Sequence, residues 1–130
     1  MELTEDDPRH IGPWTVEAVH FREIGRRSYG ARIKELSADI LLIDVPTENR
    51  YGLRANLQRA KSVFSLEIPR VLDSSLDSSP QWVASDPVSG RRLGEVLSED
   101  GPLAPHQWAE LAKTALIGCA ALRSNDIQAF

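Results

Sequence analysis

The sequence contains few of the features that stabilise a protein covalently or hold it in a membrane. Cys119 is the only cysteine, so the chain cannot close an internal disulfide, and a reducing compartment is expected. No apolar run approaches the roughly 20 residues that span a bilayer, and the first residues lack the basic and then apolar pattern of a secretory signal. We therefore predict a cytoplasmic protein with no membrane partner.

The sequence also lacks an excess of basic residues. Its 15 lysines and arginines against 19 acidic residues give a net charge of −4, which provides no general attraction to nucleic acid. One local basic cluster contains Arg22, Arg26, Arg27 and Arg32, with Tyr29 among them. Acidic residues at positions 17, 23 and 35 interrupt this cluster, so we predict no nucleic-acid partner.

Histidines are scarce and widely separated. His10, His20 and His106 have no cysteine or carboxylate partners at the spacing of metal ligands. Cys119 lies within an apolar stripe, where a small buried hydrophobic residue is favoured over a nucleophile. We therefore predict neither a metal site nor a catalytic cysteine.

The rest of the composition is that of one folded domain. Hydrophobic residues make up 42% of the 130 positions, which is ordinary for a globular protein and enough for a single core. Glu2, Glu5, Asp6 and Asp7 have no apolar partners, which predicts a flexible, solvated acidic tail over residues 1–10. Residues 11–130 are predicted to form the domain.

Several segments have the patterns of strands. Residues 14–21 alternate with apolar groups on both faces, and residues 28–33 can return beside them as a hairpin. Residues 38–46, "ADILLIDVP", form a continuous apolar run that ends in proline and predicts a buried central strand. Two shorter strands are predicted at 70–75 and 80–86, joined by a serine-rich turn.

Helical patterns occur between and after these strands. Thr47 can cap a helix whose apolar positions recur at spacings of four, three and four. These positions are Leu53, Leu57, Ala60 and Phe64. A short helix is predicted around residues 93–97, and a long one over 105–123. Because the first strands follow one another through short turns instead of alternating with helices, we predict an α+β fold.

This order of elements resembles the N-terminal lobe of a bacterial, eukaryotic-like Ser/Thr protein kinase. The resemblance depends on "IGPWTV", "RRSYGAR" and "ADILLIDVP" as the first three strands, then on "RVLDSS" and "QWVASDPVSGRRLGEVLSEDGPLAP" as the last two strands, the hinge and the following helix. It implies a five-stranded antiparallel sheet with one packed helix, followed by a short helix and a long C-terminal helix.

The phosphate loop of such kinases is not present in the matching hairpin. The three glycine positions of G-x-G-x-x-G, which let backbone amides approach ATP phosphates, fall on Phe21, Glu23 and Arg26. Side chains at 21 and 26 would block the approach, and the carboxylate at 23 would repel phosphate. A solvated turn is the favoured interpretation, and phosphate binding by Arg26 and Arg27 is the alternative.

The kinase ion pair is also missing. The resemblance places the phosphate-binding lysine of the third strand at Leu42 or Ile43, depending on a one-residue choice of register, and its glutamate partner near Ala60. Both halves are apolar, and apolar groups can pack where one unpaired buried charge would be costly. The resemblance therefore implies a cleft filled by side chains, with no bound cofactor.

The catalytic motifs that follow the long helix in a kinase are not found. "LRSNDIQAF" resembles the approach to H-R-D, with Ala129 near the histidine position, and the sequence ends at Phe130. Neither a catalytic aspartate nor the D-F-G metal ligand is present, so we expect that this chain alone is not an enzyme.

The long helix is the candidate interface. In a whole kinase the corresponding helix packs in the C-terminal lobe, so here its apolar stripe needs another cover. The candidate residues are Trp108, Leu111, Ala115, Leu116, Cys119 and Leu122. We expect a pseudokinase-like module that acts through protein contacts. The stripe would pack back on the small lobe, pair with a second copy or dock a partner, and self-association as a homodimer is the first expectation.

Two alternatives remain open at this stage. The chain could be a nucleotide sensor or atypical kinase fragment that still binds ATP, with Arg26 or Lys34 in place of the lost lysine. It could also be a truncated remnant, or one part of a system that needs another chain.

Overall fold

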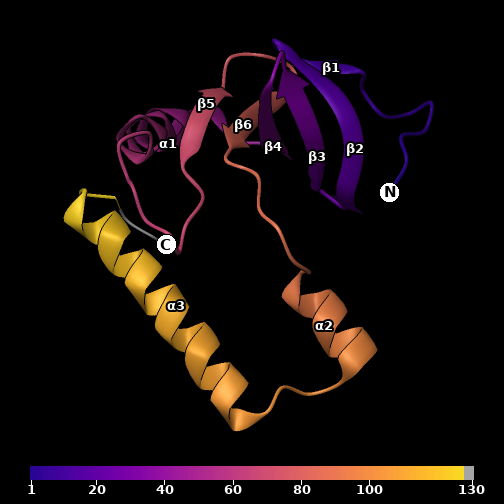
Figure 1. Ribbon diagram of the computed structural model, residues 1–130. Helices are drawn as coiled ribbons and strands as arrows, with labels where there is room; N and C mark the ends of the chain where they lie inside the picture. Colours follow the sequence, from indigo (N-terminus) through magenta and orange to yellow (C-terminus); the bar gives the residue numbers. More distant parts are fainter. Residues whose placement is uncertain (128–130) are drawn as a thin grey trace.

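The computed structural model describes residues 1–127, and within them six strands form one sheet accompanied by three helices (Figure 1). The elements are β1 (His10–Ile11), β2 (Trp14–Glu23), β3 (Arg26–Ile33), β4 (Leu36–Ile43), α1 (Thr47–Ala60), β5 (Val71–Ser75), β6 (Gln81–Ser85), α2 (Leu93–Asp100) and α3 (Pro105–Ser124). The predicted α+β class is confirmed. The sixth strand is the two-residue β1, which pairs with the start of β2.

The sheet has the order β1-β2-β3-β4-β6-β5, and every neighbouring pair is antiparallel. Helix α1 follows β4 and lies beside the edge strand β5 in Figure 1. The pairing of β2 with β3 is irregular between Val16 and Ala18 and again between Val19 and Phe21. Such bulges bend and twist a strand, which fits the curled sheet seen in Figure 1.

The hydrophobic core lies on one face of this sheet. In β4, Ala38 and Ile40 are buried and Leu42 packs against them, while Asp39 and Leu41 lie on the other face, as the two-residue period of a strand requires. The buried cluster contains Ile11, Trp14, Val16, Val19, Tyr29, Ala31, Ala38, Ile40, Trp82 and Ala84. The opposite face of the sheet is therefore free to form the floor of a site.

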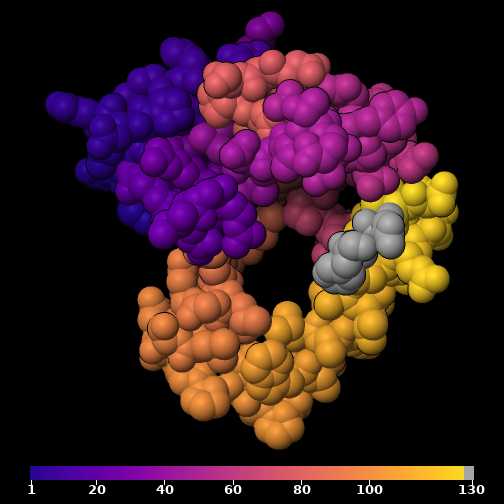
Figure 2. Space-filling model, turned by 180° about the vertical axis from the view of Figure 1, so that it is seen from behind, coloured from indigo at the N-terminus to yellow at the C-terminus, as the bar shows by residue number. Residues whose placement is uncertain are grey.

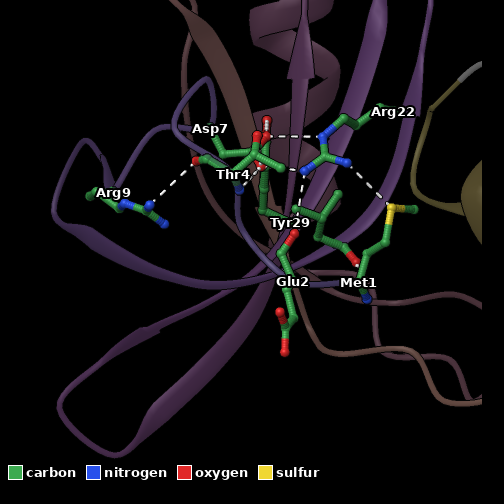
Figure 3. Close-up of polar contacts among 8 residues, drawn as sticks. Met1, Glu2, Thr4, Asp7, Arg9, Arg22 and Tyr29 are labelled. Atoms are coloured by element: carbon green, nitrogen blue, oxygen red, sulfur yellow. Dashed lines mark hydrogen bonds and ion pairs between the residues drawn. The ribbon is translucent and has the colours of Figure 1, made fainter.

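The first residues are held against β2 and are not wholly solvated (Figure 3). The Met1 amino group donates to the Val19 carbonyl at 3.1 Å, and the Val19 amide donates to the Met1 carbonyl at 3.1 Å. Asp7 is buried, so the prediction that it is solvated is wrong. Its carboxylate accepts hydrogen bonds from Thr4, from Arg22 of β2 and from Tyr29 of β3. The acidic composition of the segment could not reveal these partners.

Helix α1 begins at Thr47, the residue predicted as its cap, and its predicted apolar face is only partly confirmed. Leu53, Leu57 and Ala60 are partly buried, but the helix ends at Ala60 and Phe64 is exposed. The Arg70 guanidinium lies 5.6 Å from the centroid of the Phe64 ring. Pro46, and not Thr47, is the capping residue.

Helices α2 and α3 extend away from the sheet. Figure 2 shows an opening between the sheet, α2 and α3. Gly118 is the buried residue of α3, and a Cβ placed there would lie 3.3 Å from Cγ2 of Ile68, so this is where α3 approaches the loop before β5. The remainder of α3 is mostly exposed.

Candidate functional site

A cleft of about 440 Å³ lies between the β2–β3 hairpin and the connector that joins β6 to α2. The face of the sheet opposite the core forms its floor, through Ser28, Leu41 and Ser85. Phe21 and Arg26 of the hairpin form one wall, and residues 88–92 of the connector form the other. This position follows from the alternation of β4, because its core-facing side chains are turned away from the cleft.

The structure brings most of the predicted cleft residues together around the hairpin. Phe21 and Arg26 line the cleft itself. Glu23, Leu42 and Ile43 lie around the turn of the hairpin, next to the cleft.

The structure also shows which of Leu42 and Ile43 lies on the cleft side of β4. Leu42 belongs to the face that packs on the core, and Ile43 shares the face of Leu41. Ala60, at the end of α1, is not among the residues that line the cleft. Ala129 lies outside the described residues.

Arg92 ties the connector to the hairpin. Its guanidinium lies 4.1 Å from the centroid of the Phe21 ring, an arrangement that permits a cation–π interaction. The same guanidinium forms an ion pair with Glu23, whose other oxygen accepts a hydrogen bond from Arg26 at 3.1 Å. The hydrogen bond from Arg92 is the main cause that lowers the pKa of Glu23, so this carboxylate is ionised at neutral pH.

Asp39 makes a second connection across the cleft. One of its oxygens lies 2.9 Å from His20 Nε2, at hydrogen-bond distance, and the other accepts the amide of Val88 at 2.9 Å. Gly30 allows His20 to come this close, because a Cβ at position 30 would lie 3.3 Å from His20 Nε2. Asp39 thus joins β2, β4 and the connector.

The sequence analysis missed Arg92, Asp39 and His20 as members of this site. Of the two aspartates in the apolar run 38–46, Asp39 is the one within β4, which is a usable signal that its side chain leaves the core. Nothing in the sequence marks Arg92, because it is separated from Glu23 by 69 positions.

The donor set of the cleft does not suit a metal. In residues 1–127 no cluster of three or more histidine, cysteine or carboxylate groups could hold a metal ion. Strand β4 carries no lysine or arginine, so it provides no cation for a phosphate group. In the same range, no helix has the length and apolar character needed to cross a membrane.

The predicted interface residues of α3 are largely exposed. Trp108, Leu111 and Leu116 expose 45%, 40% and 70% of their surface. Ala115 is exposed, whereas Cys119 and Leu122 are half-buried near the contact with the loop before β5. Ile117, which was not predicted as part of the stripe, exposes 42%.

The fold is that of the N-terminal lobe of a protein kinase, continued by two helices. No protein-family model matches the sequence, and no curated protein has a significantly similar sequence. Among solved structures, the chain resembles a mutant of the Mycobacterium tuberculosis PknI kinase domain, with a TM-score of 0.82 and 14% identity over 97% of this chain and 53% of that one. A further PknI kinase domain structure matches with a TM-score of 0.81 and 14% identity, over 90% of this chain and 50% of that one.

These matches define a fold and not an activity. The chain spans about half the length of the kinase domains it matches. At such low identity the similarity concerns the path of the backbone, and function has to be argued from the side chains of the site.

Proposed function

We propose that the chain is a catalytically inactive, kinase-like module that acts by binding protein, in the first place a second copy of itself. The observation that carries this proposal is the exposed apolar stripe of α3, a 20-residue helix whose buried residue is a glycine at its contact with the lobe. The single cysteine supports a reducing, cytoplasmic location for this module.

The α3 stripe is larger than isolated exposed side chains would explain. Single apolar residues on a surface are ordinary, but contiguous patches mark interaction sites. A helix of 20 residues is about 30 Å long, so its stripe presents apolar groups over the width of a small domain. Pairing with the same stripe of a second copy would bury both faces at once, as in a symmetric dimer.

The side chains at the cleft support the proposal that this chain does not transfer phosphoryl groups. A kinase aligns ATP with a glycine-rich loop, a lysine and Mg²⁺ ligands, and charge stabilisation by these groups is almost the whole of its catalysis. Here an ionised carboxylate, Glu23, lies at the hairpin, and β4 carries no cation. Arg26 and Arg92, which line the cleft, are already paired with Glu23, so neither is free to neutralise a polyphosphate.

A nucleotide sensor is the second candidate, and the geometry makes it less favourable. Arg26 is already paired with Glu23. Lys34 follows the far end of β3, an eight-residue strand, so it lies roughly 25 Å from the hairpin end. A third candidate is that the chain is a remnant or one part of a longer or split system, in which other polypeptide covers α3.

Light scattering across a concentration series tests the proposed role of α3. We expect the wild-type chain to self-associate and Leu116→Asp to weaken association by roughly tenfold or more, because a charge would be placed in an apolar contact. Thr114→Asp, at an exposed position about 200° before Leu116 around the helix, is the matched control and should leave association unchanged. A wild-type monomer at every concentration would contradict self-association, and equal effects of the two variants would contradict the assigned face.

A further inference from the structure

The cleft is crossed by contacts that come entirely from the chain itself. Arg26 and Arg92 converge on the two oxygens of Glu23, one from the hairpin and one from the connector. Phe21 places its ring under the Arg92 guanidinium, 4.1 Å away. The carboxylate of Glu23 therefore takes the position between two arginines that an anionic ligand would otherwise occupy.

The connector is fixed at a second point by Asp39. The amide of Val88 donates to Asp39, so this backbone donor is unavailable to a ligand. Asp39 is in turn held at hydrogen-bond distance from His20, whose place beside Gly30 is set by the pairing of β2 with β3. At the two ends of the connector wall, the Val88 amide and the Arg92 guanidinium are therefore both bonded to other residues of the chain.

We propose that these contacts form an autoinhibitory latch across the cleft, in which Glu23 acts as an internal anion that occupies Arg26 and Arg92. The latch consists of the pairs Glu23–Arg26, Glu23–Arg92 and Phe21–Arg92, together with the Asp39–Val88 hydrogen bond. When it opens, two arginines become available to an anionic group such as a polyphosphate.

The contacts have the character of a reversible device. Glu23 and Arg92 keep 38% and 44% of their side-chain surfaces exposed, and exposed ion pairs contribute little to stability one at a time. The tip of the hairpin does not hold the structure closed, since Ile24 is fully exposed and a Cβ at Gly25 would meet nothing within 4 Å. The connection of the hairpin to the connector therefore depends on the latch and not on the packing of the tip.

Hydrogen exchange of the full chain, without any nucleotide, tests the latch directly. Arg92→Ala should accelerate exchange of the hairpin, residues 21–28, by roughly two- to fivefold, which corresponds to the loss of an exposed ion pair. Arg91→Ala is the matched control, because Arg91 pairs with Glu99 and Asp100 on α2 and not with the hairpin. Equal exchange of the hairpin in both variants would overturn the proposal.

A second arm tests the role of Glu23 as an internal anion. Inorganic tripolyphosphate should raise the unfolding midpoint of Glu23→Gln and leave the wild type unchanged, and adding Arg92→Ala to Glu23→Gln should remove the shift. Glu99→Gln is the control, since it breaks a comparable exposed pair outside the cleft. If Glu23→Gln responds no more than Glu99→Gln, Glu23 is not the group that occupies the arginines.

The outcome is separable from that of the proposed function. The exchange experiment contains no ligand and no partner, and the variants leave the α3 stripe intact. Loss of self-association in Leu116→Asp with no difference between Arg92→Ala and Arg91→Ala would keep the interaction module and remove the latch. The converse pattern would keep the latch and remove the proposed interface.

Discussion

At the residue scale, the buried carboxylate of Asp7 fixes the position of the first residues of the chain. Its oxygens accept from the Thr4 amide at 2.8 Å and from the Tyr29 hydroxyl at 3.0 Å, and they form an ion pair with Arg22 (Figure 3). The hydrogen bond from Arg22 is the main cause that holds the pKa of Asp7 far below its ordinary value. Ionised Asp7 therefore links the first residues to β2 and β3.

The sign of the pH dependence follows from this lowered pKa. Because the folded state binds the Asp7 proton more weakly than the unfolded state, the contribution of Asp7 to stability is fully present at neutral pH. It decreases as the pH falls below about 4, where the unfolded carboxyl takes up its proton.

We predict that Asp7→Asn lowers the thermal unfolding midpoint at pH 7 by roughly 5 °C or more, because the buried donors lose a charged acceptor. The difference between variant and wild type should shrink as the pH is lowered toward 3. Asp6→Asn, at an exposed neighbouring position, is the control and should change neither value. A wild-type midpoint for Asp7→Asn at pH 7 would show that this cluster does not stabilise the fold.

At the scale of elements, the sequence predicted the strands and helices better than the faces they present. The run 38–46 overlaps β4 well, because a buried strand is rich in β-branched and apolar residues. The same property hid its orientation, since Leu42 and Ile43 are equally apolar and alternation gives no contrast. The pairing of strands from distant parts of the sequence decided which of them faces the core.

Gly12, in the turn between β1 and β2, is fixed by its packing against β6. Its φ of +55° lies in the left-handed region, and a Cβ there would be 2.8 Å from Cζ2 of Trp82. We predict that Gly12→Ala destabilises the chain by about 1–3 kcal/mol, measured by denaturant unfolding. Gly52→Ala is the matched control: it lies within α1 with nothing within 4 Å of an added Cβ, and should stabilise the chain by about 0.5–1 kcal/mol. Similar effects of both substitutions would contradict this account of the turn.

On the scale of the whole molecule, the order of elements could be predicted but the contacts between distant segments could not. The α+β class followed from strand and helix patterns, each of which is local, and the kinase-lobe fold followed from the resemblance of the ordered segments to that family. The latch joins Glu23 to Arg92, and the buried cluster joins Asp7 to Tyr29, through partners that only the folded chain brings together. Figure 1 also shows that α2 and α3 lead away from the sheet. The local pattern of each helix does not predict this arrangement, because it depends on contacts between distant segments.

The amide NMR spectrum of the chain, titrated with Mg²⁺ and ATP, tests the central claim that the cationic groups of this cleft are already occupied by its own carboxylate, Glu23. We predict no saturable shift of the signals from residues 21–27, 39–43 and 86–92 as the nucleotide is added. Saturable shifts confined to these three segments would show that a nucleotide enters the cleft, and would contradict the account of an inactive module.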